Sequence, residues 1–97
     1  MRLNKIVVAV GFILSVITPL GALAAPPGFC DGYARSAVNQ IADRRSHPRE
    51  CGYANPNDAR WHGGFDRHYN WCLGVSRETA DGERFARREH LERCRGR

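Results

Sequence analysis

Two residues whose types and spacing could support chemistry, His68 and Cys72, lie four positions apart in this sequence. On a helix this spacing sets both side chains on one face, as two ligands of a zinc ion would require. Cys51 and His62 would complete a set of two cysteines and two histidines. The intervals of 11, 6 and 4 residues match no compact zinc finger, however, and the sequence has no Cys-x-x-Cys pair. We therefore predict no metal and no cofactor, and keep a metal-binding or redox-active protein as the alternative.

Hydrolytic and redox catalysis are also poorly supported. The segment His62-Gly63-Gly64 is similar to the oxyanion-hole loop of esterases, but the sequence has no Gly-x-Ser-x-Gly and is too short for the sheet that this motif needs. The serines belong to no signature with a paired histidine and aspartate. Disulfide exchange would favour closely spaced cysteines, which are absent. We predict that the protein is not an enzyme.

The N-terminus has the pattern of a secretory signal peptide. Two cations, Arg2 and Lys5, precede an apolar run over residues 6–17, and Ala22-Leu23-Ala24 supplies a small-residue cleavage site. We expect residues 1–24 to form a signal helix that is cleaved after Ala24, which places the protein in the periplasm or outside the cell. The alternative is a retained anchor, since about 20 apolar residues suffice to span a membrane.

Residues 25–97 then form one small domain of 73 residues. A chain of this size buries little apolar surface, and four cysteines in an oxidising compartment would supply disulfides as crosslinks. The net charge of +5 falls to about +3 when the signal peptide leaves with its two cations. The arginines near the C-terminus alternate with acids, so we predict no specific nucleic acid as a partner and contact with membrane only through the signal segment.

Three helices are indicated by apolar residues spaced three and four apart. The first runs from Phe29 to Arg45, with Asp31 available as a cap, and stops before Pro48. An irregular connection leads to the second helix, which covers at least Phe65 to Leu73. The third is capped by Ser76 and runs to about Arg95. The fold class is therefore all-α, a small three-helix domain that runs up, down and up.

This arrangement determines how the cysteines pair. Successive cysteines would lie at alternate ends of the domain, about 24 Å apart for a helix of some sixteen residues. A disulfide requires Cα atoms within about 7 Å. The predicted disulfides are therefore Cys30–Cys72 and Cys51–Cys94.

On the second helix, His68 lies on the core stripe with Trp61, Phe65 and Cys72. We predict a buried or half-buried histidine whose ring bonds to a backbone carbonyl or to a neighbour such as Glu83. On the third helix Ala80, Leu91 and Cys94 share a stripe. Glu83 and Arg87 lie on the same side, at a spacing that pairs opposite charges. Phe85 falls off the stripe and is expected to cover an edge.

The residues that could bind a partner are aromatic and basic. Five aromatic residues crowd into positions 53–71, and core packing is their simplest explanation. The functional alternative is an exposed aromatic anchor at Tyr53 or Trp71, with arginines on the third helix beside it. The candidate binding residues are Tyr53, Trp61, Trp71, Arg84 and Arg88. The expected partner is an unknown protein or an anionic component of the cell envelope.

Several motifs resemble those of a family of short secreted proteins of proteobacteria. These are "CDGYARSAVNQ", "CGYANPNDARWHGGFDRHYNWCLGV" and a final series of Glu83, Arg87, Leu91 and Cys94. The resemblance extends from Cys30 to Cys94, and His-x-x-Trp-Cys is its most specific element. It implies a single four-cysteine secreted module and carries over no activity and no catalytic or binding residues. From the residues themselves we predict a binding or structural module of the cell envelope.

Overall fold

The computed structural model of the protein describes residues 23–53 and 55–96. Within these ranges the chain is mostly helical and has no β-strand, apart from an isolated bridge between Ala24 and Ser76. The helices of the described residues are α2 (Pro27–Arg45), α3 (Pro48–Cys51), α4 (Phe65–Leu73) and α5 (Arg77–Arg95). The all-α class is confirmed. The predicted signal helix lies outside the described residues.

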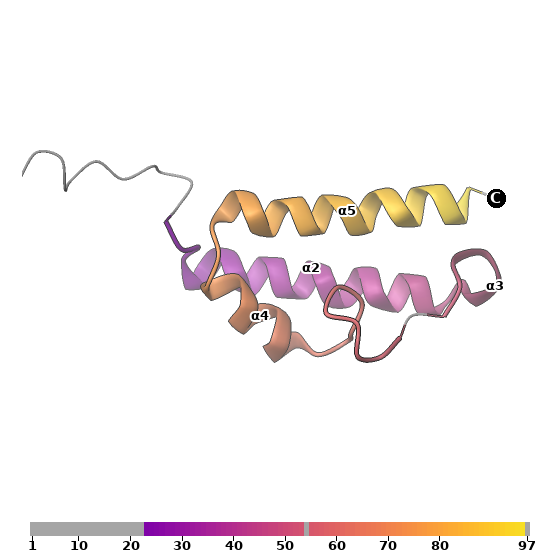
Figure 1. Ribbon diagram of the computed structural model, residues 1–97, viewed down its shortest axis with the longest axis horizontal. Helices are drawn as coiled ribbons and strands as arrows, with labels where there is room; N and C mark the ends of the chain where they lie inside the picture. Colours follow the sequence, from indigo (N-terminus) through magenta and orange to yellow (C-terminus); the bar gives the residue numbers. More distant parts are fainter. Residues whose placement is uncertain (1–22, 54, 97) are drawn as a thin grey trace, which may run out of the picture.

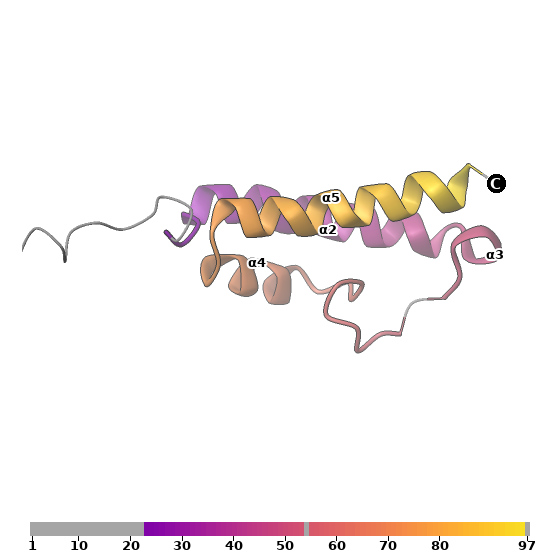
Figure 2. The same ribbon diagram turned by 45° about the horizontal axis from the view of Figure 1, so that its top comes forward.

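The long helices α2 and α5 lie side by side and run in the same direction, while α4 runs in the opposite direction and packs on α2 near its start (Figure 1). Figure 2 shows α4 and the irregular residues 55–64 on one side of this pair. The predicted up, down and up course is therefore present. Its downward part is an irregular segment followed by a helix of only nine residues.

The helix count differs from the prediction. Three helices were expected, whereas the described residues contain a fourth, α3, around Cys51. Pro48 fits the first turn of a helix because its missing N–H has no partner to lose there. The turn ends at Gly52, whose φ of 77° lies in the left-handed region that glycine adopts without strain. A four-residue helix leaves too little periodicity in the sequence to be recognised.

The start of α2 also corrects the prediction. The helix begins at Pro27, two residues earlier than expected, with Pro26 in the capping position and no side-chain cap. Asp31 is not the cap, because it lies one turn inside the helix and pairs with Arg35 at 2.8 Å. By contrast, the Ser76 hydroxyl accepts a hydrogen bond from the Thr79 N–H at 3.1 Å, as expected for the cap of α5.

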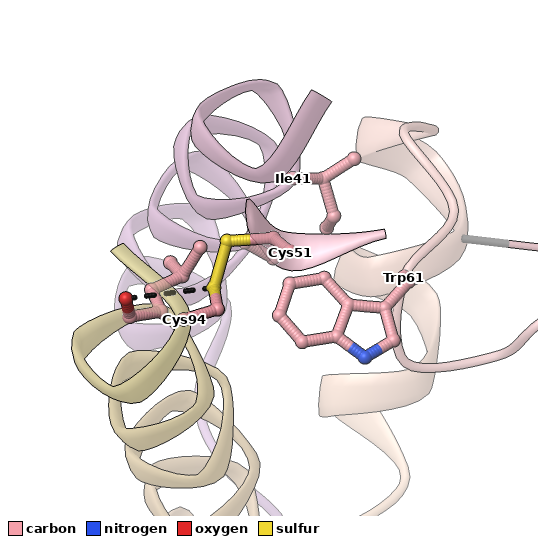
Figure 3. Packing of buried hydrophobic residues seen from close by; sticks show 6 residues of the cluster. Ile41, Cys51, Trp61 and Cys94 are labelled. Carbon is pink, nitrogen blue, oxygen red and sulfur yellow. Dashed lines mark hydrogen bonds between the residues drawn. A yellow bond between two sulfur atoms is a disulfide. The ribbon is translucent and has the colours of Figure 1, made fainter. Parts of the chain in front are cut away.

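Both predicted disulfides are present, with Cα–Cα distances of 5.6 Å for Cys30–Cys72 and 4.9 Å for Cys51–Cys94. Each lies within its own cluster of buried residues, one at either end of the helix pair. Figure 3 shows the Cys51–Cys94 disulfide packed against Ile41 and Trp61. The other cluster consists of Ala25, Cys30, Tyr33, Cys72 and Ala80. The core is therefore divided into two crosslinked halves.

Candidate functional site

The imidazole of His68 is placed by α4, where it faces inward and is 2% exposed. Its Nε2 lies 2.7 Å from the carbonyl oxygen of His62, so Nε2 carries the proton and donates. This confirms the prediction of a buried histidine bonded to a backbone carbonyl. Glu83, which was offered as an alternative partner, accepts hydrogen bonds from Arg60 instead.

The rings of His62 and His68 are stacked, with centroids 3.9 Å apart and planes 12° from parallel. The pKa of His62 is lowered to about 4, mainly by burial and also by the neighbouring His68, Arg67 and Arg87. The pKa of His68 is also lowered, first by burial. Both rings are therefore neutral at pH 7. Since Nδ1 of His62 accepts from the Gly64 N–H at 3.2 Å, its proton belongs on Nε2.

The candidate zinc ligands do not form a metal site. Cys51 and Cys72 are bonded to Cys94 and Cys30, so neither sulfur is a thiolate that could bind zinc. Across residues 23–53 and 55–96, no three histidine, cysteine or acidic side chains are grouped closely enough to hold a metal ion. The pair in "HYNWC" is a core histidine beside a disulfide cysteine.

Arg87 is the largest fully buried side chain of the described residues. Its Nε donates to the Gln40 side-chain oxygen at 2.7 Å, and its Nη1 lies 3.4 Å from the carbonyl of Arg60. The remaining amino group, Nη2, is buried and has no acceptor among the described residues. The guanidinium also lies 5.2 Å from the Tyr33 ring. The sequence predicted an ion pair of Arg87 with Glu83, but Glu83 forms its ion pair with Arg60 instead.

A cavity of about 560 Å³ opens beside these groups. It lies between α2, α4, α5 and the segment 58–62, and its walls combine two aromatic rings with charged side chains. The lining residues that matter for recognition are Tyr33, Arg67, His68, Trp71 and Arg87. A concave site with aromatic walls and a few converging polar groups is the usual form of a small-molecule site.

The structure separates the predicted binding residues from one another. Trp71 is 40% exposed and lines the cavity, with its ring 5.6 Å from that of Tyr33. Trp61 is only 6% exposed and belongs to the Cys51–Cys94 cluster. Tyr53 is 88% exposed and does not line the cavity.

The two predicted arginines lie outside the cavity lining as well. Arg84 is half-buried, with its guanidinium 5.7 Å from the Phe29 ring, and it forms an ion pair with Asp81. Arg88 is exposed and lies 5.2 Å from the ring of Phe85, which is itself exposed. The three arginines that line the cavity, Arg60, Arg67 and Arg87, were not among the candidates. Arg67 directly precedes His68, but adjacent residues do not share a helix face, so the sequence carries no signal for its place in the lining.

Fold and site together define a small disulfide-bonded all-α protein with a cavity lined by aromatic rings and arginines. Comparisons with models of protein families, with curated proteins and with solved structures found no match to this chain. No helix of the described residues is long and apolar enough to cross a membrane. The two disulfides indicate an oxidising, extracytoplasmic compartment.

Proposed function

We propose that this protein is an extracytoplasmic binding module whose ligand enters the cavity between α2, α4 and α5. One observation carries the proposal: a partly exposed tryptophan, Trp71, and a buried arginine, Arg87, line the same cavity of about 560 Å³. Partly exposed aromatic rings give a ligand a large apolar contact at low cost in conformational entropy. A ligand bound in the cavity would cover the exposed part of the Trp71 ring.

A binding role is favoured over catalysis by the chemistry of the cavity wall. The described residues that line it include no serine, threonine or free cysteine that could act as a nucleophile. The two histidines are stacked on each other, and His68 uses its Nε2–H to bond a backbone carbonyl. The wall therefore offers hydrogen-bond donors and aromatic surface, which suit recognition.

The proposed location is the periplasm or the cell exterior, after cleavage behind Ala24. The packing of Ala25 supports this cleavage site. Ala25 is buried in the Cys30–Cys72 cluster, and its backbone nitrogen donates to the Val75 carbonyl at 2.7 Å, whereas Ala24 is exposed. A new N-terminal ammonium at Ala25 would keep this donor. The cleaved chain fits the family of four-cysteine secreted proteins that it resembles.

The partner is proposed to be an anionic component of the envelope or a protein with an acidic group. Three arginines line the cavity against two acids, and both histidines there are neutral at pH 7. The excess of positive charge would favour a negatively charged ligand over a neutral or cationic one.

The test is a screen of small molecules by NMR, with uniformly ¹⁵N-labelled exported protein. The set holds equal numbers of neutral, anionic and cationic compounds with one aromatic ring. We expect binders to shift the indole N–H of Trp71 and the amides of α4 around His68. Binders that shift only the amides near Tyr53 and leave those of α4 unchanged would contradict the proposal.

Two variants serve as a matched pair in this screen. Trp71→Ala removes an aromatic ring from the cavity wall and should weaken binding at least tenfold. Phe85→Ala removes an exposed ring that does not line the cavity, and binding should be unchanged. Equal effects of both variants would show that the cavity is not the binding site.

A further inference from the structure

The guanidinium of Arg87 lacks part of its hydrogen bonding within the protein. The side chain is fully buried, and Nη2 has no acceptor among the described residues. A buried guanidinium without its full set of hydrogen bonds is destabilising, because its lost hydration is only partly replaced. An acceptor that entered the cavity beside Arg87 would remove this deficit.

The nearby carboxylates do not supply that acceptor. Both oxygens of Glu83 accept from Arg60, at 2.9 Å each, in a two-pronged ion pair. One oxygen of Asp58 accepts from the backbone N–H of Arg60 at 2.8 Å. The guanidinium of Arg60 thus occupies both oxygens of Glu83, and neither acid of the cavity wall accepts a hydrogen bond from Arg87 Nη2.

The charges that line the cavity fit a ligand with a single negative charge. Arg60, Arg67 and Arg87 face the cavity against Asp58 and Glu83, which leaves one uncompensated positive charge. A carboxylate would neutralise this charge, whereas a phosphate dianion would leave an excess negative charge in a partly enclosed site. A planar carboxylate also matches the planar fork of donors on a guanidinium.

The rest of the ligand is defined by the aromatic wall. The rings of Tyr33 and Trp71 lie 5.6 Å apart on the same side of the cavity, and Trp71 is partly exposed. From these observations we propose that the cavity is a receptor site for a small monocarboxylate with an apolar or aromatic body. Its carboxylate bonds to Arg87, and its body packs on Trp71. This inference rests on the proposed function and names the ligand class for the same site.

The experiment uses 3-phenylpropionate as the probe and 3-phenylpropionamide as its uncharged analogue. Isothermal titration calorimetry at pH 7 measures both affinities, and ¹⁵N NMR follows the side-chain Nε–H of Arg87. We expect the acid to bind at least tenfold more tightly than the amide and to shift the Arg87 signal. Equal affinities of acid and amide would overturn the carboxylate inference and leave the binding-module proposal intact. If neither probe binds, and the NMR screen also finds no ligand in the cavity, both proposals fail.

Two further probes extend the test. One asks whether the carboxylate comes from a peptide C-terminus, and the other asks whether a different anion binds better. N-acetyl-glycyl-phenylalanine presents the same group as a peptide C-terminus, and tighter binding of this probe would support the inference and identify a chain end as its source. Inorganic phosphate should bind at least tenfold more weakly than 3-phenylpropionate. Tighter binding of phosphate would contradict the inference.

The variants keep the test independent of folding. Arg87→Met preserves most of the buried side-chain volume, and we expect it to remove the preference for acid over amide. Arg88→Met changes the next residue, an exposed arginine outside the cavity lining, and should leave that preference unchanged. If Arg87→Met does not fold, Trp71→Ala takes its place. Trp71→Ala should weaken the binding of acid and amide by the same factor. A variant that loses affinity for the acid but not for the amide would contradict the assigned roles.

Discussion

At the scale of single residues, the stacked histidines couple the folded state to pH. The pKa of His62 is about 4 in the folded protein against an ordinary value of 6.5, and burial is the main cause. His68, Arg67 and Arg87 also contribute to this lowering, whereas Asp58 opposes it. The unfolded chain therefore takes up a proton before the folded protein does as the pH falls. Stability is fully present above pH 6.5 and decreases progressively toward pH 4.

We expect the free energy of unfolding to fall by about 1–3 kcal/mol between pH 7 and pH 4.5, from the size of the His62 shift. Urea titrations followed by circular dichroism at several pH values measure this loss. His62→Gln should reduce the pH dependence because the titrating ring is gone. His47→Gln changes a histidine outside the stack and serves as the control. A pH dependence that is identical in His62→Gln and the wild type would refute this explanation.

A second residue-scale prediction concerns the support of Arg87. Gln40 accepts from the Arg87 Nε at 2.7 Å, and its own amide donates to the Arg84 carbonyl at 3.0 Å. Gln40→Ala should lower the free energy of unfolding by about 1–3 kcal/mol, since it leaves a buried charged donor unpaired. The neighbouring Asn39→Ala, at an exposed position, should change it by less than about 0.5 kcal/mol. Denaturant unfolding of both variants provides the comparison.

At the scale of elements, residues at the N-terminus of α5 connect this helix to the neighbouring segments. Ser76 caps the helix through its hydroxyl. Val75, just before it, accepts the bond from Ala25. The start of α5 therefore holds together the beginning of the folded domain and the end of α4.

We expect Ser76→Ala to lower stability by about 1 kcal/mol, because the Thr79 N–H loses its acceptor. Ser76→Gly should cost only a few tenths of a kcal/mol, since glycine is itself a tolerated cap. Thermal unfolding of the two variants tests the order. A Gly variant that is less stable than the Ala variant would show that the cap is not the dominant contribution.

At the scale of the whole molecule, two disulfides hold the two halves of the core. Each joins residues 42 or 43 positions apart. In the chain-entropy account, closure of a loop of this size contributes up to about 4 kcal/mol. For a domain of this size such a contribution is a large share of the total stability.

We expect the replacement of both Cys51 and Cys94 by alanine to leave α4 in place. It should disrupt the packing of the buried cluster that contains Trp61. Replacement of Cys30 and Cys72 should release α4 and with it the cavity wall. Trp61 and Trp71 fluorescence separates the two effects, because each tryptophan lies beside one crosslinked half. Loss of all helical structure in both double variants would mean that the halves do not behave as separate units.

Cleavage and oxidation are tested on natively exported protein by intact mass, with and without reduction. We expect a chain that begins at Ala25 and is lighter by four hydrogens before reduction, with Cys30 linked to Cys72 and Cys51 to Cys94. A chain that keeps Met1 would contradict the cleavage, and free thiols would contradict the disulfides in the exported protein.

Much of this fold follows from local sequence signals. The spacing of apolar residues predicts α2, α4 and α5, because a helix that buries one face repeats every 3.6 residues. The bounds of α4 and the cap of α5 agree with the prediction. From the helix directions and the even spacing of the cysteines, the disulfide pairing also follows, since only residues at the same end can meet.

The cavity was decided by tertiary packing. The sequence by itself shows His68 on a core stripe and Arg87 one turn beyond Glu83, but not that Arg60 takes the carboxylate of Glu83. It places Trp61 and Trp71 in one aromatic segment, yet Trp61 is buried in the core and Trp71 lines the cavity. The reason is physical: periodicity gives the direction of a side chain on its own helix, whereas its partners come from segments whose path is irregular. Residues 52–64 have no such period, and they bring Arg60 and His62 to the site.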